Sequence, residues 1–197
     1  MTSDKRMKTM EEKRDRILQS AIQLFAENSY EQTTVAQVAK KAGVSFGTVF
    51  TYFENKEELY FQSVNEPLEQ LVKKFLQFDT KTDDVLNEIS RMIKDHLILF
   101  SQQKKYLQLI VKVNGTHEQF PEVFQLVYER TQELIRQISK LIENGQRRGE
   151  LVEGESEYIA TAYISLLFGL ELSYIDELGE ELINTYTQIA KRLFGPR

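Results

Sequence analysis

Residues 33–59 read TTVAQVAKKAGVSFGTVFTYFENKEEL. Thr34 and Gln37 have the spacing of a capping box, which predicts the start of a short helix. Gly43 can adopt a positive φ, so the chain can turn sharply there. Ser45 is a suitable cap for a second short helix. The stretch therefore predicts two short helices joined by a tight turn.

The second of these helices, expected at 46–52, has an inward and an outward side. Val49 and Phe53 are four residues apart and can both face a core. The residues left on the outer side are Phe46, Gly47, Thr48, Thr51 and Tyr52. This pattern is typical of a helix-turn-helix, whose second helix enters the major groove of DNA. An ordinary helical hairpin with a polar outer face is the alternative.

The same stretch resembles the TetR/AcrR family of bacterial transcription regulators. The resemblance lies in the threonine pair, AxxAGVS, GTVF, YF and NKEEL, which all fall in register. It implies an all-helical homodimer with an N-terminal DNA-binding domain and a C-terminal domain for ligand binding and dimerisation. Two positions depart from the family pattern: Phe50 replaces the usual Tyr, and Ser29 replaces a favoured Gly.

The residues expected to contact DNA combine the outward side of the second helix with its flanks. Lys56 lies in the first turn of the next helix, where free N–H groups favour a phosphate. Lys5, Arg6 and Lys8 belong to an arm, expected to be disordered over residues 1–10, that either reaches DNA or stays solvated. The expected contact set is Thr33, Thr34, Ser45, Phe46, Gly47, Thr48, Thr51, Tyr52 and Lys56.

Composition restricts the class of protein. The chain has 197 residues and a net charge of −5. It has no cysteine, which excludes disulfides and cysteine-ligated metals. Its basic residues are enriched in the N-terminal part, where DNA would bind. Residues 1–16 lack the apolar segment of a signal peptide, and polar residues interrupt the longest apolar run, 158–175. We therefore expect a cytoplasmic protein that does not enter a membrane.

Apolar periodicity and turn residues predict an all-α fold of about nine helices. Pro67 lies inside the fourth helical pattern, which it must either kink or end. The predicted domains are 1–54, a three-helix DNA-binding domain, and 55–197, for ligand binding and dimerisation. The expected helices are 11–27, 34–42, 46–52, one from 55 onward, 82–101, one ending near 113, 121–148, 155–177 and 180–193.

Catalytic motifs are missing from the sequence. His96 and His117 lie on different segments, and there is no metal-binding His motif, P-loop or GxGxxG, so no enzyme activity, metal or cofactor is expected. Aromatic residues instead recur at helical spacing, which fits either a plain core or the ligand cavity that the resemblance implies. Polar residues beside them, including Asn114 and His117, can equally be surface groups. The candidate pocket residues are Phe75, Phe78, His96, Phe100, Tyr106, Phe120, Phe124, Tyr128, Phe168 and Glu171.

The last two expected helices carry more apolar surface than one neighbour can cover, which predicts a homodimer. The expected interface is Tyr163, Leu166, Leu170, Tyr174, Leu182, Tyr186, Ile189 and Leu193. The sequence thus predicts a dimeric repressor that binds a palindromic double-stranded DNA operator and is released by a small apolar or amphipathic ligand. The alternatives are a ligand-recruited activator and a helical scaffold protein without a DNA role.

Overall fold

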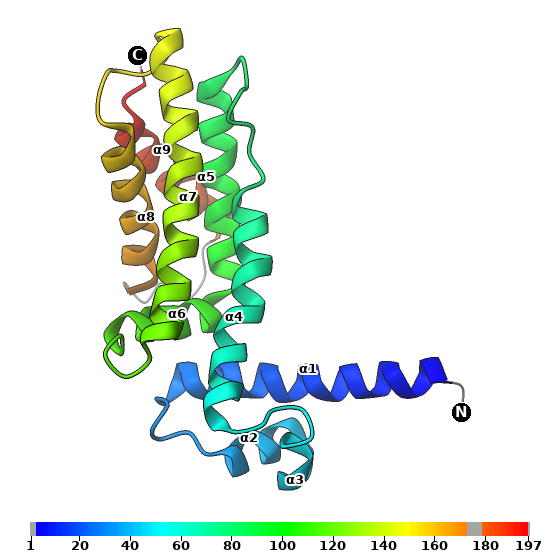
Figure 1. Ribbon diagram of the computed structural model, residues 1–197. Coiled ribbons are helices and arrows are strands. Elements are labelled where there is room, and N and C mark those ends of the chain that lie inside the picture. Colours follow the sequence, from blue (N-terminus) through cyan, green and yellow to red (C-terminus); the bar gives the residue numbers. More distant parts are fainter. Residues whose placement is uncertain (1–2, 173–178, 197) are drawn as a thin grey trace. The chain divides into compact units, whose positions relative to one another are not determined.

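The computed structural model describes residues 3–172 and 179–196 of the chain, which form an all-α fold (Figure 1). The elements in order are α1 (Ser3–Glu27), α2 (Val35–Ala42), α3 (Phe46–Val49), α4 (Lys56–Phe75), α5 (Val85–Gln102), α6 (Lys104–Gly115), α7 (Pro121–Arg148), α8 (Ser156–Leu172), α9 (Glu180–Lys191) and the 3-10 helix η1 (Arg192–Phe194). The prediction of an all-α fold with about nine helices is confirmed for these residues.

The chain divides into two compact units. The first comprises Met1–Leu68 and Lys105–Phe124, and the second comprises Glu69–Lys104 and Gln125–Arg197. The first unit is larger than the segment 1–54 predicted to bind DNA, because it includes the first turns of α4 and most of α6. The functional boundary at residue 54 stays a prediction.

Helix α1 is longer than expected. It begins at Ser3, so the prediction of a disordered arm over residues 1–10 is wrong for the part that the structure describes. Residues 3–12 contain no Gly or Pro and are rich in Lys, Met and Glu, which are good helix formers. The Thr9 hydroxyl also donates a hydrogen bond to the Lys5 carbonyl, 2.8 Å away.

The core of the first unit lies where α1 packs on α2. The buried side of α1 repeats at helical spacing, as the sequence predicted, and α2 contributes Val38, Ala39 and Ala42. Helix α4 continues through Pro67, which therefore does not end it. The buried residues of α1 are Ile17, Leu18, Ala21, Ile22, Phe25 and Ala26.

A buried histidine lies at the centre of the second unit. His96 of α5 is 1% exposed, and its Nε2 lies 2.8 Å from the Phe75 carbonyl at the end of α4. Because a carbonyl can only accept, Nε2 carries the proton, and Nδ1 accepts from the Tyr163 hydroxyl at 2.9 Å. Burial lowers the pKa of His96 to about 4, so the ring is neutral at pH 7.

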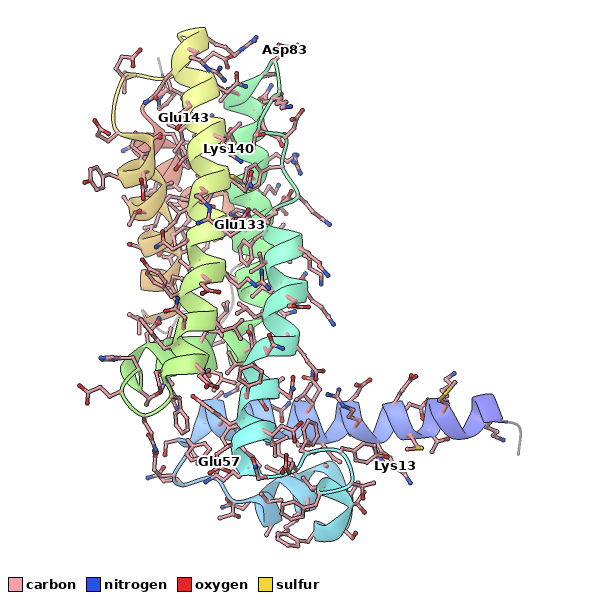
Figure 2. The ribbon with its side chains drawn as sticks, viewed as in Figure 1. Lys13, Glu57, Asp83, Glu133, Lys140 and Glu143 are labelled. Carbon is pink, nitrogen blue, oxygen red and sulfur yellow. The ribbon has the colours of Figure 1, made fainter. Side chains whose placement is uncertain are left out.

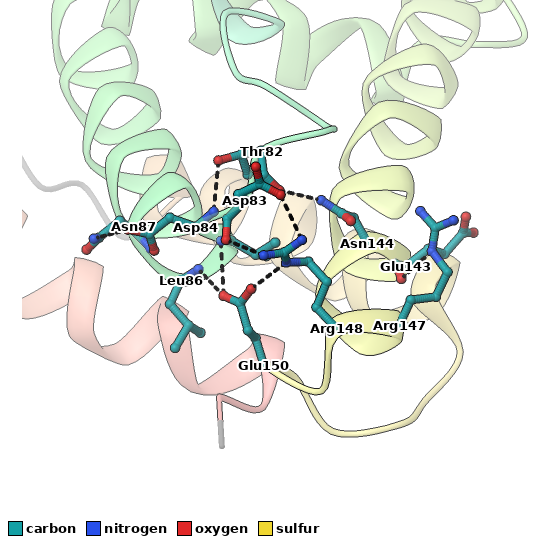
Figure 3. A network of polar contacts seen from close by, with 11 residues as sticks. Thr82, Asp83, Asp84, Leu86, Asn87, Glu143, Asn144, Arg147, Arg148 and Glu150 are labelled. Atoms are coloured by element: carbon teal, nitrogen blue, oxygen red, sulfur yellow. Dashed lines mark hydrogen bonds and ion pairs between the residues drawn. The ribbon is translucent and has the colours of Figure 1, made fainter.

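Polar contacts join the loop before α5 to the end of α7. Figure 2 places Asp83 on this loop and Glu133, Lys140 and Glu143 along α7. The Arg148 guanidinium donates to the Asp83 carboxylate at 2.8 Å and to Glu150 at 2.9 Å (Figure 3). Glu150 in turn accepts from the backbone N–H of Val85, at 3.0 Å, and so caps the first turn of α5. The corner is held by side chains whose partners all lie within this unit.

Glycine packing and an isolated bridge complete the second unit. A Cβ at Gly145 of α7 would lie 2.7 Å from Leu151 Cγ and 2.8 Å from Val85 Cγ1, so only Gly fits there. Leu151 also forms an isolated antiparallel bridge with Pro196. No helix among the residues that the structure describes is both long and apolar enough to cross a membrane.

Candidate nucleic-acid interface

Helix α2 has the ends that the sequence predicted. The Thr34 side chain accepts from the Gln37 N–H at 3.2 Å, and Gln37 Oε1 accepts from the Thr34 N–H at 2.7 Å, which completes the capping box. At the other end Gly43 has φ 67°, and its N–H bonds back to Ala39 and Lys40. These two ends fix the length of α2 and direct the chain into α3.

Helix α3 is shorter than the expected range 46–52. Ser45 caps it by accepting from the Thr48 N–H at 3.2 Å, and the helix ends at Val49. Turn hydrogen bonds from Tyr52 N–H and Phe53 N–H to the Val49 carbonyl continue the curvature. Val49 and Phe53 are each 1% exposed, so they hold this segment on the core as predicted.

The outward side of α3 carries two exposed aromatic rings. Phe46 is 55% exposed and Phe50 is 43% exposed, and their ring centroids are 5.1 Å apart in an edge-to-face arrangement. Gly47 and Thr51 are exposed beside them, and Tyr52 is half-buried. Phe50 was absent from the predicted contact set, although its place one turn after Phe46 was the signal that could have included it.

Gly47 has no internal reason to be glycine. A Cβ added at this position would have no described atom within 4 Å, and its φ is not in the left-handed region. A glycine inside a helix is less favourable than alanine by about 0.5–1 kcal/mol. The backbone at Gly47 is therefore open to close approach from outside the chain.

Lys56 and Asn55 form the start of α4. Asn55 Oδ1 accepts from the Glu58 N–H at 2.8 Å, so Asn55 caps the helix as expected. The Lys56 ammonium lies 4.1 Å from the centroid of the Tyr30 ring, a cation–π contact that holds it at the helix N-terminus. A fixed cation beside free helix N–H groups is suited to a phosphate.

The prediction that the Thr33 side chain contacts DNA is wrong. Thr33 is 0% exposed, and its hydroxyl donates to the Leu24 carbonyl at 3.2 Å. The side chain therefore connects the end of α1 to the loop before α2. Thr34, Ser45 and Thr48 are accessible to different degrees, but their hydroxyls already serve the helix caps.

The predicted pocket residues fall into two groups. In the second unit, His96 lies beside Phe75 at 4.6 Å between ring centroids, Phe75 beside Phe100 at 5.5 Å, and Phe100 beside Phe168 at 6.0 Å. Phe78 also approaches His96, at 6.2 Å.

The other predicted pocket residues are elsewhere. Tyr106, Phe120 and Phe124 belong to the first unit, and the Tyr106 hydroxyl donates to the Val64 carbonyl at 2.6 Å. Tyr128 is exposed, as are Asn114 and His117, and the side chain of Glu171 lies outside the described residues. The ligand pocket stays a prediction.

The exposed face of α8 differs from the predicted one. Tyr163 is 0% exposed and bonded to His96, so its assignment to a dimer interface is wrong. Leu166 and Leu170 are half-buried, and Tyr174 lies outside the described residues. The side of α8 opposite Tyr163 carries the exposed residues Tyr158, Thr161, Ala162, Ser165 and Leu172.

The exposed side of α9 matches the predicted one. Leu182, Ile189 and Leu193 are exposed and Tyr186 is half-buried, whereas Ile183, Ala190 and Phe194 face the interior. The apolar stripe on this side of α9 consists of Leu182, Tyr186, Ile189 and Leu193.

Two short capped helices joined by a tight turn, the second with an exposed outer side, form a helix-turn-helix of the kind found in DNA-binding transcription regulators. Residues 17–62, from α1 into α4, match the family of bacterial regulatory proteins of the tetR type. The match to the tetR family thus covers the N-terminal segment from α1 into α4.

Known proteins resemble the chain over most of its length. It is 25% identical over 148 residues to a fatty acid metabolism regulator protein of Bacillus subtilis, covering 75% of each chain. It is 22% identical to the biofilm operon negative transcriptional regulator IcaR of Staphylococcus aureus, covering 68% of this chain and 71% of that protein.

Solved structures show the same fold. A regulatory protein in the tetR family from Rhodococcus RHA1 aligns with a TM-score of 0.81 at 18% identity, covering 94% of this chain and 98% of the other. The fatty acid degradation regulator FadR from Bacillus halodurans aligns with a TM-score of 0.70 at 21% identity, covering 92% and 94%.

Proposed function

We propose that the protein is a repressor that binds a palindromic operator as a homodimer and is released by a small ligand. The observation that carries the proposal is the outward side of α3, where Phe46, Gly47 and Phe50 are exposed and Gly47 has no internal role. Apolar rings can contact thymine methyl groups, and glycine permits close backbone approach to DNA. A relative named as a negative regulator supports repression.

The phosphate contact at Lys56 gives the first test. Duplexes that bind the protein are selected from random sequences, and their affinity is then measured across a range of salt concentrations. Lys56→Ala should weaken binding about tenfold. It should also make the negative slope of log K against log salt less steep by about 0.9, because one phosphate contact is lost.

Lys73 provides the matched control, because it is an exposed lysine near the other end of α4. Lys73→Ala changes the net charge equally and should leave the salt slope unchanged. Equal slopes for both variants would reject Lys56 as a phosphate contact. Selection that returns no preferred duplex would reject operator binding itself and favour the helical scaffold.

Repression requires its own measurement. In vitro transcription from a promoter that contains the selected duplex should fall when the protein is added. A rise that depends on an added ligand would instead support the ligand-recruited activator.

The dimer is proposed from the apolar stripe on α9 and the exposed side of α8. Apolar residues at helical spacing would leave a contiguous exposed patch on a monomer. Small residues Thr161, Ala162 and Ser165 on the neighbouring helix allow close contact with a second copy. A two-fold axis would also present two α3 helices to two half-sites.

Ile189→Glu tests this interface. Ile189 is 45% exposed in the chain, so the change should leave the monomer folded but place a charge in the interface, costing several kcal/mol of association, on the order of 3–5. Sedimentation should show monomers and operator affinity should fall with it. Gln188→Glu adds the same charge at an exposed position of α9 outside the apolar stripe and should stay dimeric. A dimeric Ile189→Glu would place the interface elsewhere.

The effector is proposed to be apolar or amphipathic, bound in the second unit near Phe75, Phe100 and Phe168. The names of two relatives, a fatty acid metabolism regulator and FadR, add fatty-acyl compounds to the candidates. Such a ligand should raise the melting temperature by mass action and weaken operator binding. The division into domains 1–54 and 55–197, and the cytoplasmic location, stay predictions.

A further inference from the structure

A groove lies in the first unit between the start of α4 and the start of α7, separate from the aromatic residues of the second unit. Its volume is about 450 Å³, within the range of small-molecule sites. Its lining residues are Asn55, Glu57, Glu58, Phe61, Gln119, Phe120, Pro121, Glu122 and Val123.

The lining combines apolar walls with carboxylates. Phe61 and Phe120 are half-buried and Val123 is buried, so apolar surface forms part of the groove. Carboxylates come from Glu57 and Glu58 of α4 and from Glu122 of α7, and Figure 2 marks Glu57 on the first turn of α4.

The neighbouring basic residue Lys56 does not line the groove. It stands between Asn55 and Glu57 in sequence, but it is not among the lining residues, and its ammonium lies over the Tyr30 ring. Within this fully described part of the chain, no lining residue is basic.

Hydrogen bonds hold two of the three carboxylates in place. Glu57 accepts a hydrogen bond from the Tyr30 hydroxyl at 2.7 Å, and this bond holds the pKa of Glu57 below its usual value. Glu58 accepts from the Glu54 N–H, and Glu122 lies exposed in the first turn of α7.

Acidic residues are common at helix N-termini because they interact favourably with the helix dipole. The charge of the two dipoles is, however, smaller than the charge of the three carboxylates. Each helix N-terminus is equivalent to about +0.5 elementary charge, so the ends of α4 and α7 together offset about one of the three carboxylates. The charge of Lys56 also acts on Glu57 and offsets about one more, so about one negative charge remains. It lies beside two aromatic rings, whose faces themselves attract cations.

We propose that this groove binds an organic cation, with an ammonium group at Glu57, Glu58 and Glu122 and an apolar body against Phe61 and Phe120. The inference concerns binding alone and does not depend on the proposed repressor function. It can therefore fail while operator binding is retained, or hold if operator binding is rejected.

Three probes with one apolar body and different head groups test the proposal: 4-phenylbutylamine, 4-phenylbutanol and 4-phenylbutyrate. Calorimetric titration of the full chain without DNA at pH 7 should show the amine bound at least about tenfold more tightly than the alcohol, as expected for a charged hydrogen bond. The butyrate should bind more weakly still, because like charges repel.

Variants locate the site. Glu122→Gln should weaken the affinity for the amine at least about fivefold and change the affinity for the alcohol by no more than about twofold. The substitution removes the charge of the side chain but keeps its size and shape. Glu118→Gln is the matched control, since Glu118 is exposed nearby but does not line the groove, and it should change neither affinity. Phe61→Leu should weaken the amine and the alcohol together.

Four outcomes would overturn the proposal. They are no binding of the amine up to about 5 mM, an alcohol or butyrate affinity equal to that of the amine, an unchanged amine affinity in Glu122→Gln, and equal losses in Glu122→Gln and Glu118→Gln.

Discussion

Gly47 on the outward side of α3 and Gly145 at the corner of α7 are both helical glycines, but their surroundings differ. Around Gly145, Leu151 and Val85 occupy the space that a Cβ would need. Around Gly47 no described atom lies within 4 Å of a Cβ. Packing inside the chain requires glycine at position 145, whereas nothing inside the chain requires it at position 47, which lies on the exposed side of α3.

The side-chain contacts of the two regions also differ. At the corner, Arg148, Asp83 and Glu150 bond to one another and to the start of α5 (Figure 3). At α3, the exposed rings of Phe46 and Phe50 form an edge-to-face pair. Residues of the second unit should therefore affect stability, and residues of the α3 surface should affect binding.

The largest effect is expected from acid, through His96 in the interior of the second unit. Its folded pKa of about 4 lies below the ordinary value of 6.5, so the unfolded chain binds more protons between these values. The stabilising contribution is complete above pH 6.5 and is lost as the pH falls to 4, a difference of about 3 kcal/mol.

Urea unfolding at pH 7 and pH 4, at fixed protein concentration, measures this loss. His96→Gln should lose about 3 kcal/mol less than the wild type over the same interval. His117→Gln, a change at an exposed histidine, should behave like the wild type. A wild-type loss equal to that of His96→Gln would contradict the neutral, buried imidazole.

Gly145→Ala should be next in size. The added methyl group would overlap Leu151 and Val85, and overpacking of this kind costs about 1–3 kcal/mol in the free energy of unfolding. Operator affinity, measured well below the melting temperature, should not change. Gly115→Ala on α6, where a Cβ has nothing within 4 Å, is the control and should be neutral or slightly stabilising.

Gly47→Ala should show the opposite combination. Operator affinity should fall about tenfold, about 1.4 kcal/mol, because the methyl group would meet DNA. The free energy of unfolding should stay the same or rise by up to about 1 kcal/mol, because alanine favours a helix. Full operator affinity in this variant would remove the contrast between the two glycines.

Gly43→Ala should have a smaller effect, which comes from backbone strain and not from packing or DNA contact. Gly43 has space around it but a φ of 67°, where a side chain is strained, so stability should fall by about 1 kcal/mol. Gly43→Asn should lose less, since asparagine tolerates this region better. Circular dichroism melts of both variants measure the difference, and equal losses would argue against backbone strain.

Local signals in the sequence predicted the helix-turn-helix well. Thr34, Gly43 and Ser45 act on backbone groups within a few residues, so their roles could be assigned without a structure. The burial of Thr33 could not be assigned, because it depends on the Leu24 carbonyl at the end of another helix.

The sequence could not predict which side of α8 is exposed, for a different reason. Its residues are apolar nearly all the way round, so periodicity could not tell the side that meets Phe194 and His96 from the exposed side. Helix α9 alternates more clearly, and its exposed stripe was predicted correctly.

The pairing of Leu151 with Pro196 has a consequence for the topology of the chain. The Val152 N–H donates to the Gly195 carbonyl at 2.8 Å, so residues 151–196 form a closed loop that contains both α8 and α9. Once closed, the loop has already lost the entropy of bringing its ends together. Local opening should therefore release α8 and α9 as one cooperative unit, and the amide of Val152 should exchange its hydrogen at the same rate as those of the two helices.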